Sequence, residues 1–493
     1  MDWQALQQTM PRDKDLPQRS FQITALTAIL NGRQYDGIAH SFQDELSGAG
    51  EYITLSNRRP SVRSNLCRTV VNDSVSLLFS EGHFPRVHSA DKTTAEALTA
   101  WAKERRLNEV FADAATRGSV GSVALLFKVL RKKPFVSVMN TAFLTPEWDP
   151  EDPDGLLNVT ERYKVRGRDL TAKGYEVPAA AAADWFWFQR SWDAVEETWF
   201  LPLSVTEAAE GKKAVRDGAR SLVHGLGFIP VHWIRNLPGG DDVDGGCTFE
   251  AAISTAIEVD YQLSSAGRGL KYAADPKLVI RDPSGKDQPL TGGAANAIVL
   301  GAPDSDAKFL EINGTAASAV LEHVRYLRAV ALESIHGNRA DADKISAAQS
   351  GRAMELMNQG LIWLADRLRT SYGEGALLAI MRMVCMASAK VQGGIIIDGK
   401  QTSGLTADGL LLQWPAWFAP TDADKQSAAG AVSTLVQRGV ISEETATRIV
   451  AGSYDVEDIA AERARILAER AAADARLAQQ PGVQTKVSEA LST

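Results

Sequence analysis

The sequence predicts an α+β protein that is mainly helical and contains one antiparallel β region. Apolar residues recur at helical spacing in several long stretches, which indicates amphipathic helices. Between about residues 120 and 234, β-branched and aromatic residues alternate with turn signals, which is typical of an antiparallel meander. Beyond residue 421 the sequence is again helical in pattern and rich in alanine.

Length, composition and charge narrow the possible functions. The chain has 493 residues, of which 45% are hydrophobic, so it can bury a large core. Its 53 basic and 61 acidic residues give a net charge of -8, which excludes a broadly basic nucleic-acid-binding surface. Three dispersed cysteines without a Cys-x-x-Cys pair favour a reducing compartment over a disulfide scaffold or a structural zinc site. We expect no signal peptide and no membrane span.

The first half of the chain predicts two helices followed by strands. Residues 61–80 place Val71, Val75 and Leu78 on one helical face, and residues 93–117 predict a second helix that ends at Gly118. Five of the 11 tryptophans lie in the β region, where we favour sheet packing over a ligand-stacking role. The predicted β stretches are 120–144, 156–166, 184–191, 195–203 and 228–234, with turn signals at 131–134 and 152–155.

The middle of the chain predicts two long helices on either side of short strands. A glycine-rich acidic segment, 238–246, predicts a hinge before the first helix, 248–272. That helix has two apolar faces, so we expect neighbours on both sides. The second helix, 315–335, aligns Val320, Val324, Leu327, Ala331 and Ile335. Between the helices, short strands are predicted at 277–280, 297–300 and 309–312.

The last third predicts helices separated by glycine and proline. A polar break, 336–348, precedes a long helix from Gln349 towards Lys390, which Gly373 and Gly375 should kink or divide. A linker at 415–420 leads to the final helices, the last at 456–478 with Arg465/Glu469 and Arg470/Asp474 pairs at i,i+4. We expect a mobile tail from Gln479.

No motif in the sequence supports catalysis. Residues 394–401 match a phosphate-binding loop except at Gln401, and a helix rather than a strand precedes them, so a β-hairpin is the better interpretation. Residues 150–161 partly match a calcium loop, but Pro150 replaces the first ligand; we favour an acidic turn and leave cation binding open. Residues 434–450 resemble a helix-turn-helix, but Glu443 and Glu444 would meet the DNA phosphates, so we expect a packed helix pair. We therefore predict no catalytic residue, no metal and no cofactor; a nucleotide-dependent enzyme is the outside alternative.

Four stretches, in this order, carry a resemblance to a known family. They are 57–79, then 225–232 with Asn236 and the acidic hinge, then Ser350-Gly-Arg-Ala-Met354, and finally 439–445 before a Glu-rich helix. Together they make the chain similar to the portal proteins of tailed double-stranded DNA bacteriophages, in the class found in long-tailed phages. The alternative is another ring component of the virion, in the neck or baseplate.

The resemblance implies the portal fold, with an antiparallel β wing, a two-helix stem, a small β-containing clip and a helical crown. The wing would comprise 1–246 and 349–420, and the stem helices 247–272 and 313–335. The clip would be 273–312, the tunnel loop 336–348, and the crown with a mobile tail 421–493. Two helices around a short β segment would form a protruding hairpin whose remaining apolar faces need neighbouring subunits to cover them.

The resemblance also implies function, partners and site residues. The protein would form a homo-oligomeric ring, usually of twelve subunits, at one capsid vertex, through which double-stranded DNA is packaged and ejected. Partners would be the terminase large subunit, the major capsid protein or scaffold, and head-completion adaptor and tail proteins. It would assemble in the host cytoplasm and reside in the virion. The tunnel loop would place at the DNA His336, Asn338, Arg339, Asp341, Asp343 and Lys344. The stem channel and subunit contacts would use Ile253, Ile257, Arg268, Lys271, Arg325 and Arg328.

Overall fold

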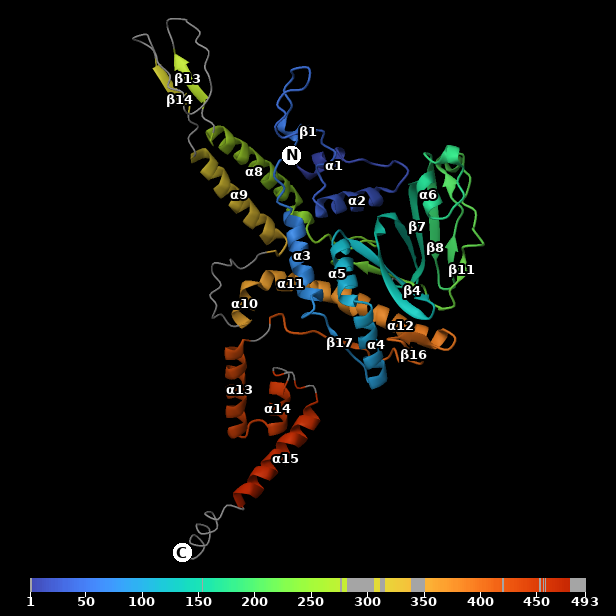
Figure 1. The fold of residues 1–493 in the computed structure, drawn as a ribbon, viewed down its shortest axis with the longest axis vertical. Helices are drawn as coiled ribbons and strands as arrows, with labels where there is room; N and C mark the ends of the chain where they lie inside the picture. Colours follow the sequence, from blue (N-terminus) through green and yellow to red (C-terminus); the bar gives the residue numbers. More distant parts are fainter. Residues whose placement is uncertain are drawn as a thin grey trace, which may run out of the picture. The chain divides into compact units, whose positions relative to one another are not determined.

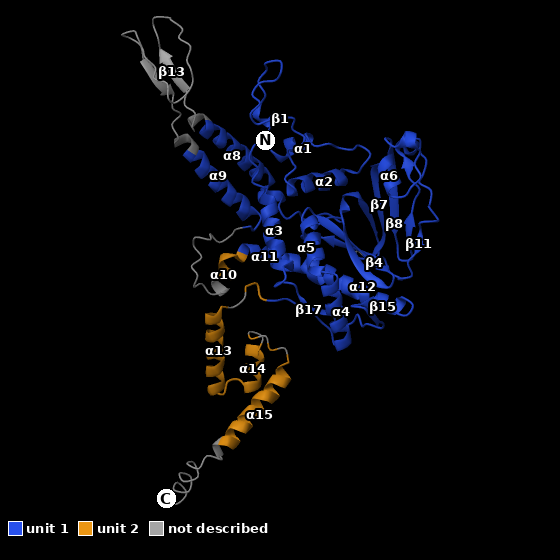
Figure 2. Cartoon of the chain, in the orientation of Figure 1, with its two compact units in different colours: residues 1–338, 360–415 blue, residues 339–359, 416–493 orange. Residues whose placement is uncertain are grey.

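A computed structural model of the chain confirms a mixed α+β protein. It describes residues 2–152, 154–274, 277–281, 306–310, 315–337, 351–418, 421–451, 454, 456 and 458–478. The chain forms two compact units, the first made of residues 1–338 and 360–415 and the second of 339–359 and 416–493 (Figure 2). Residues 349–359, which we assigned to the wing, therefore belong to the second unit.

Helices at the start of the chain form part of the first unit's core. α1 (Trp3–Gln8) begins at Asp2, whose carboxylate accepts a hydrogen bond from the Ala5 amide. α2 (Gln18–Leu30) packs against α3 (Leu66–Phe79), which lies within the predicted helix 61–80. Two short parallel strands, β1 (His40–Ser41) and β2 (Arg58–Arg59), lie between α2 and α3 in the chain, together with the short helix η1 (Leu55–Asn57).

The helix predicted over 93–117 is wrong as a single element. The structure has α4 (Lys92–Glu104) and α5 (Leu107–Gly118), separated at Arg106. Arg106 adopts a left-handed backbone conformation with a φ of 49°, which an α-helix cannot contain. Trp101 and Leu107, on either side of the break, are both fully buried, so the break lets both helices bury an apolar face.

The β region is antiparallel, as predicted, but it forms two sheets rather than one meander, because β12 returns to pair with β4. A three-stranded sheet has the order β12-β4-β5, with β4 Ser122–Leu130, β5 Lys133–Met139 and β12 Val231–Arg235. A six-stranded sheet has the order β11-β9-β8-β7-β6, and β10 also pairs with β8. Its strands are β6 Leu144–Trp148, β7 Leu156–Arg166, β8 Trp185–Trp192, β9 Glu196–Trp199, β10 Leu203–Ser204 and β11 Leu222–Val223. Trp192 and Trp233 pack in one core cluster with Val159, which confirms sheet packing for these two tryptophans.

Two small helices border the larger sheet. α6 (Gly167–Ala172) follows β7, and α7 (Val205–Ala209) follows β10. A 3-10 turn, η3 (Ala179–Ala181), precedes β8, and another, η2 (Thr141–Phe143), joins β5 to β6. These connections leave β7 and β8 paired over eight successive positions, from Val159 opposite Trp192 to Arg166 opposite Trp185.

The long helix predicted from Gln349 towards Lys390 is divided at Gly373 and Gly375, as we expected. α11 (Gln359–Leu368) and α12 (Leu378–Lys390) are joined by a π-helical segment, η6 (Arg369–Leu377), which contains Gly373 and Gly375. A Cβ on Gly373 would lie 2.2 Å from the Trp414 ring, so glycine is required there. The predicted hairpin follows as β15 (Ile395–Ile397) and β16 (Lys400–Thr402), and β17 (Leu411–Gln413) pairs with β3 (Arg86–His88).

The second unit is made of helices. They are α10 (Gly351–Met357), α13 (Asp422–Gln437), α14 (Glu443–Ala451) and α15 (Ile459–Ala478). The Ser442 hydroxyl accepts a hydrogen bond from the Thr445 amide and so caps the start of α14. Arg470 does not pair along α15 as expected, but binds Glu443 of α14 at 2.8 Å. The mobile tail that we predicted from Gln479 lies outside the described residues.

Candidate functional site

The candidate site is the helical hairpin that the sequence predicts as the stem. α8 (Ile253–Ala274) and α9 (Thr315–Ser334) pack against each other (Figure 1). The 22 residues of α8 are about 33 Å long at 1.5 Å per residue. Between the helices in the chain, β13 (Lys277–Arg281) and β14 (Asp306–Leu310) pair in antiparallel register. The predicted strand 297–300 lies outside the described residues.

The face of α9 that meets the rest of the molecule is the face that the periodicity predicts. Val324, Ala331 and Ile335 are buried, and they belong to the predicted apolar line. Large apolar side chains also remain on the exposed surface of the hairpin: Leu270, Leu321, Tyr326 and Val330. Tyr326, at 66% exposed, and Val330 are four residues apart and therefore share one side of the helix.

A buried carboxylate fixes the N-terminal half of α8 to the start of the chain. Asp260 is 2% exposed and accepts hydrogen bonds from the Ser64 amide at 2.7 Å and from the Tyr35 hydroxyl at 3.0 Å. Burial raises the pKa of Asp260 above its usual range, since removing the carboxylate from water disfavours its charged form. The same burial, together with the Asp260 charge, raises the pKa of Tyr35.

Hydrogen bonds on both sides of Asp260 continue this connection. The Ser264 hydroxyl donates to the Asp260 carbonyl at 2.7 Å and accepts from the Val62 amide at 3.0 Å. The Tyr261 hydroxyl donates to the Arg58 carbonyl at 3.0 Å, and burial raises the pKa of Tyr261 to about 12. The segment before α3 is therefore bonded to α8 over about one helical turn, from Asp260 to Ser264.

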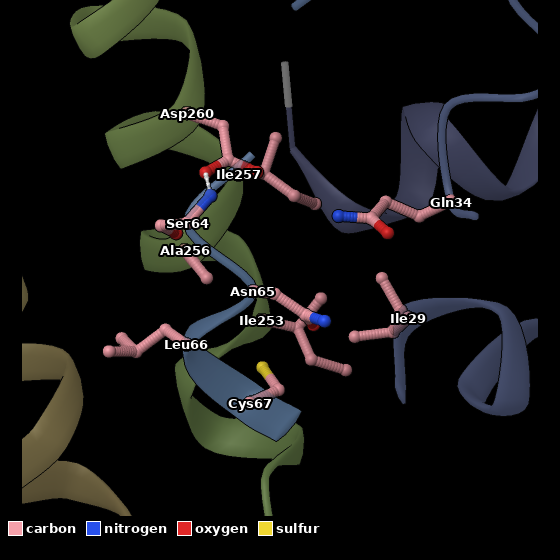
Figure 3. Close-up of a pocket in the computed structure, with 10 residues that line it drawn as sticks. All are labelled: Ile29, Gln34, Ser64, Asn65, Leu66, Cys67, Ile253, Ala256, Ile257 and Asp260. Carbon is pink, nitrogen blue, oxygen red and sulfur yellow. Dashed lines mark hydrogen bonds between the residues drawn. The ribbon is translucent and has the colours of Figure 1, made fainter. Parts of the chain in front are cut away.

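The predicted contact residues Ile253 and Ile257 lie inside this connection, which corrects their expected role. Each is 1% exposed, and both line a small cavity with Ile29 of α2 and Leu66 of α3 (Figure 3). The cavity has room for at most about one water molecule, so it is not a ligand site. Helices of the same chain already cover both isoleucines, so these side chains present no surface to another subunit.

The basic residues predicted for the channel divide into two groups. Arg268 forms an ion pair with Glu45 of the same chain and is only 21% exposed at its side chain, so it is not an open channel residue. Lys271, Arg325 and Arg328 are exposed on the hairpin. His336 is exposed just beyond α9, with a φ of 56°. The other predicted tunnel-loop residues, Asn338, Arg339, Asp341, Asp343 and Lys344, lie outside the described residues.

The segment predicted as a hinge before α8 is held in place by side chains. Arg19 forms a two-point ion pair with Asp244 at 2.5 and 2.7 Å, and it also donates to the Thr141 and Leu144 carbonyls. A Cβ on Gly240 would lie 2.0 Å from the Asp244 carbonyl oxygen, so the turn requires glycine. The segment is therefore a fixed junction within the first unit.

The π-helical segment η6 anchors the same junction from the other side. Asn236 is fully buried and donates to the Gly246 carbonyl and to the Thr248 hydroxyl, each at 2.9 Å. Its side-chain oxygen accepts from the Tyr372 hydroxyl at 3.0 Å. The Ser371 hydroxyl donates to the Asn236 carbonyl at 2.7 Å. Asn236, singled out by the resemblance, thus joins β12, the junction and η6.

Sequence reasoning missed Asp260 and Tyr35. Asp260 lies between Val259 and Tyr261 and one turn after Ile257, close to the apolar positions of the helix, and a carboxylate is almost never fully buried without a partner. The partners, Ser64 and Tyr35, are about 200 residues away and carry no recognisable spacing. Asp260 makes structural hydrogen bonds only, and its buried surroundings leave no access for a substrate.

In the part of the chain that the structure describes, no three His, Cys, Asp or Glu side chains converge as a metal site would require. Within the same residues, no helix combines the length and apolar character of a membrane span. No protein-family model and no curated protein matches the sequence.

Proposed function

We propose that this protein is the portal subunit of a tailed double-stranded DNA bacteriophage. The observation that carries the proposal is the hairpin of α8 and α9, with the β13–β14 pair between them and its base bonded to the body through Asp260. In a portal ring, such hairpins would stand side by side around a channel and form the stem. The β wing would lie outside them.

The exposed apolar residues of the hairpin support side-by-side packing. Leu270, Leu321, Tyr326 and Val330 are between 38% and 66% exposed in the single chain. A neighbouring hairpin would remove this surface from water, which contributes about 25 cal/mol for each Å² buried. These residues replace Ile253 and Ile257 as the proposed contacts between subunits.

The charge of the hairpin supports a channel that does not hold DNA tightly. α8 and α9 together carry four basic and four acidic residues, of which Asp260 is buried and Arg268 is paired with Glu45. The others are three of each sign, so the hairpin presents no net charge. Each phosphate neutralised by a basic side chain adds affinity, and a uniformly basic stem would slow DNA movement. Lys271, Arg325 and Arg328 would contact phosphates singly, while Glu322 and Glu333 limit the attraction.

In this proposal the ring docks the terminase large subunit during packaging and later binds head-completion adaptor and tail proteins. It has no catalytic activity of its own. The residues that partly match a phosphate-binding loop form the β15–β16 hairpin that we predicted in its place, with Lys400 exposed in β16. The proposal would be contradicted if the purified protein hydrolysed nucleotides and the Lys400→Ala substitution abolished that activity.

The tunnel loop provides the test of function in the particle. Asp341→Asn with Asp343→Asn adds up to two positive charges per subunit, so DNA release from filled heads should slow and become more sensitive to salt. Arg339→Ala with Lys344→Ala should leave rings intact but reduce the DNA retained in heads. Packaging and retention equal to the parent in both variants would exclude the loop from the mechanism.

A further inference from the structure

The face of the six-stranded sheet carries a basic pocket that the proposed channel does not use. The pocket has a volume of about 330 Å³ and lies over β7, β8 and β10. Three of its lining residues are basic, Arg162, Lys212 and Lys213, and none is acidic. Lys212 pairs with Glu207 at 3.0 Å, whereas Arg162 and Lys213 form no ion pair among the described residues. The pocket is therefore a local site of unpaired positive charge, although the chain as a whole has a net charge of -8.

Aromatic rings fix the cations of this face in position. The Arg162 guanidinium lies 4.2 Å from the Trp187 ring centre, and the Arg166 guanidinium lies 3.9 Å from that of Trp185. A guanidinium stacked on an indole directs its N–H groups sideways, where they can bind a carboxylate at two points. It also covers the ring, so these faces of the tryptophans are closed to the base stacking by which single-stranded nucleic acids bind. Carboxylates are thus the preferred ligand.

A strongly acidic turn lies at the other end of the same strand. The β6–β7 turn carries four carboxylates within six residues, Asp149, Glu151, Asp152 and Asp154, and none of them forms an ion pair among the described residues. The Asp154 amide donates to the Asp152 carboxylate, and the Asp149 amide to the Gly155 carbonyl, so the turn is well formed. Glu151 and Asp154 are exposed.

The basic pocket and the acidic turn cannot meet within one chain. Arg162 lies six positions beyond Leu156, where β7 starts, and a strand rises about 3.3 Å per residue, so the two sites are about 20 Å apart. Exposed apolar residues accompany each site: Leu157, 50% exposed, follows the turn, and Leu201 and Val215, 47% and 63% exposed, lie within two residues of the pocket residues Leu203 and Ala214 in the chain. The two sites are thus complementary both in charge and in apolar surface.

We infer that the occupant of the basic pocket is the acidic β6–β7 turn of a second copy of this chain. The contact joins two different surfaces of neighbouring copies, the turn of one and the pocket of the next, and is therefore heterologous. Heterologous contacts form a closed ring when the rotation that relates successive copies closes on itself. This inference rests on the proposed function, and it names one contact between neighbouring wings. Exposed charge pairs contribute little affinity each, so the contact would chiefly select the neighbour and its register, while apolar surface stabilises the ring.

The test is a charge swap measured by sedimentation velocity and negative-stain imaging of the full chain. The turn variant is Glu151→Lys with Asp152→Lys and Asp154→Lys, which changes the formal charge of the turn from -4 to +2. The pocket variant is Arg162→Glu with Lys213→Glu. Each alone should raise the concentration needed for half-assembly at least about tenfold, since like charges then face each other. A chain that carries both the turn and the pocket substitutions should assemble again, because its turn and pocket once more have opposite charges. A mixture of the two single variants should also assemble, because opposite charges meet wherever the variants alternate.

Controls separate this contact from folding and from total charge. Lys103→Glu with Lys400→Glu makes the same change in net charge as the pocket variant, at exposed positions elsewhere, and should assemble like the parent. Because Arg162 covers Trp187, Lys213→Glu alone tests the pocket if the double variant melts at a lower temperature.

The possible outcomes distinguish this contact from the ring. Rings that are indifferent to both reversals, or a combined variant that stays unassembled, would overturn the pairing and leave the portal proposal standing. Association that follows the swap but produces no ring would support the contact and contradict the portal.

Discussion

Replacing Asp260 should weaken the attachment of the stem hairpin to the body. In Asp260→Ala the Ser64 amide and the Tyr35 hydroxyl, both buried at this point, lose their acceptor. A buried donor left without a partner costs about 1–3 kcal/mol. The raised pKa of Asp260 shows that burying its charge is itself unfavourable, and removing the carboxylate recovers part of the loss.

The net loss should be about 2–4 kcal/mol in the free energy of unfolding. In a unit of this size that corresponds to a fall of about 2–5 °C in the melting temperature. The matched control is Asp260→Asn. Its amide oxygen still accepts from the Ser64 amide, and its NH₂ group can donate to the Tyr35 oxygen, so its stability should stay within about 1 kcal/mol of the parent.

The assay is urea and thermal denaturation of the parent, both Asp260 variants, Tyr35→Phe and the Asp260→Ala/Tyr35→Phe double variant. The double-mutant cycle should show a coupling of about 1 kcal/mol or more between the two residues. Since the folded pKa of Asp260 is above 3.8, the carboxylate ionises more readily in the unfolded chain. Parent stability should therefore fall, relative to Asp260→Asn, as the pH rises from 3.8 through the raised pKa. Equal stability of Asp260→Ala and the parent would refute the connection.

Two other substitutions test the core beneath the site. Ile257→Asp places a carboxylate where the side chain is 1% exposed, so denaturation should show that the free energy of unfolding falls by about 4 kcal/mol or more. The control Ile257→Val should lower it by about 1 kcal/mol. An unchanged melting curve for Ile257→Asp would mean that residue 257 faces solvent. His232 is half-buried in β12, and the loss of solvent lowers its pKa from 6.5 to about 4, so the unfolded chain binds a proton in this range and the folded chain does not. Stability should fall by up to about 3 kcal/mol as the pH falls from 6.5 to 4, and His232→Gln should lack this slope; the same pH profile in both proteins would contradict the burial of His232.

Periodicity predicted elements well where one face of a regular element is buried. The line Val324, Ala331 and Ile335 on α9 and the strand 156–166 both emerge as predicted, because spacing alone determines which side chains share a face. The break at Arg106 was not predictable in the same way. Arginine and its neighbours favour helix, and only the burial of Trp101 and Leu107 by distant segments imposes the left-handed residue.

Spacing identifies an apolar face but not the surface that covers it. Ile253 and Ile257 are four residues apart on one helical face, a spacing that also suits a contact between subunits. In the structure, however, α2 and α3 of the same chain cover them. α2 escaped notice because its apolar residues show little segregation to one side, so its packing against α3 had no sequence signal. Arg268 and Arg470 show the same limit for charges, since each pairs with a residue of another element that lies far away in sequence.

The most direct test of the account is negative-stain electron microscopy of the purified full-length chain, with its mass in solution measured by light scattering. The exposed side chains of α8 and α9, together with the basic pocket and the acidic turn, predict rings with a central hole and a mass of many subunits, of which twelve is the expected number. Leu321→Lys with Val330→Lys, which changes only exposed positions, should dissociate these rings into folded monomers. A parent protein that remains a compact monomer at every concentration would contradict the portal assignment.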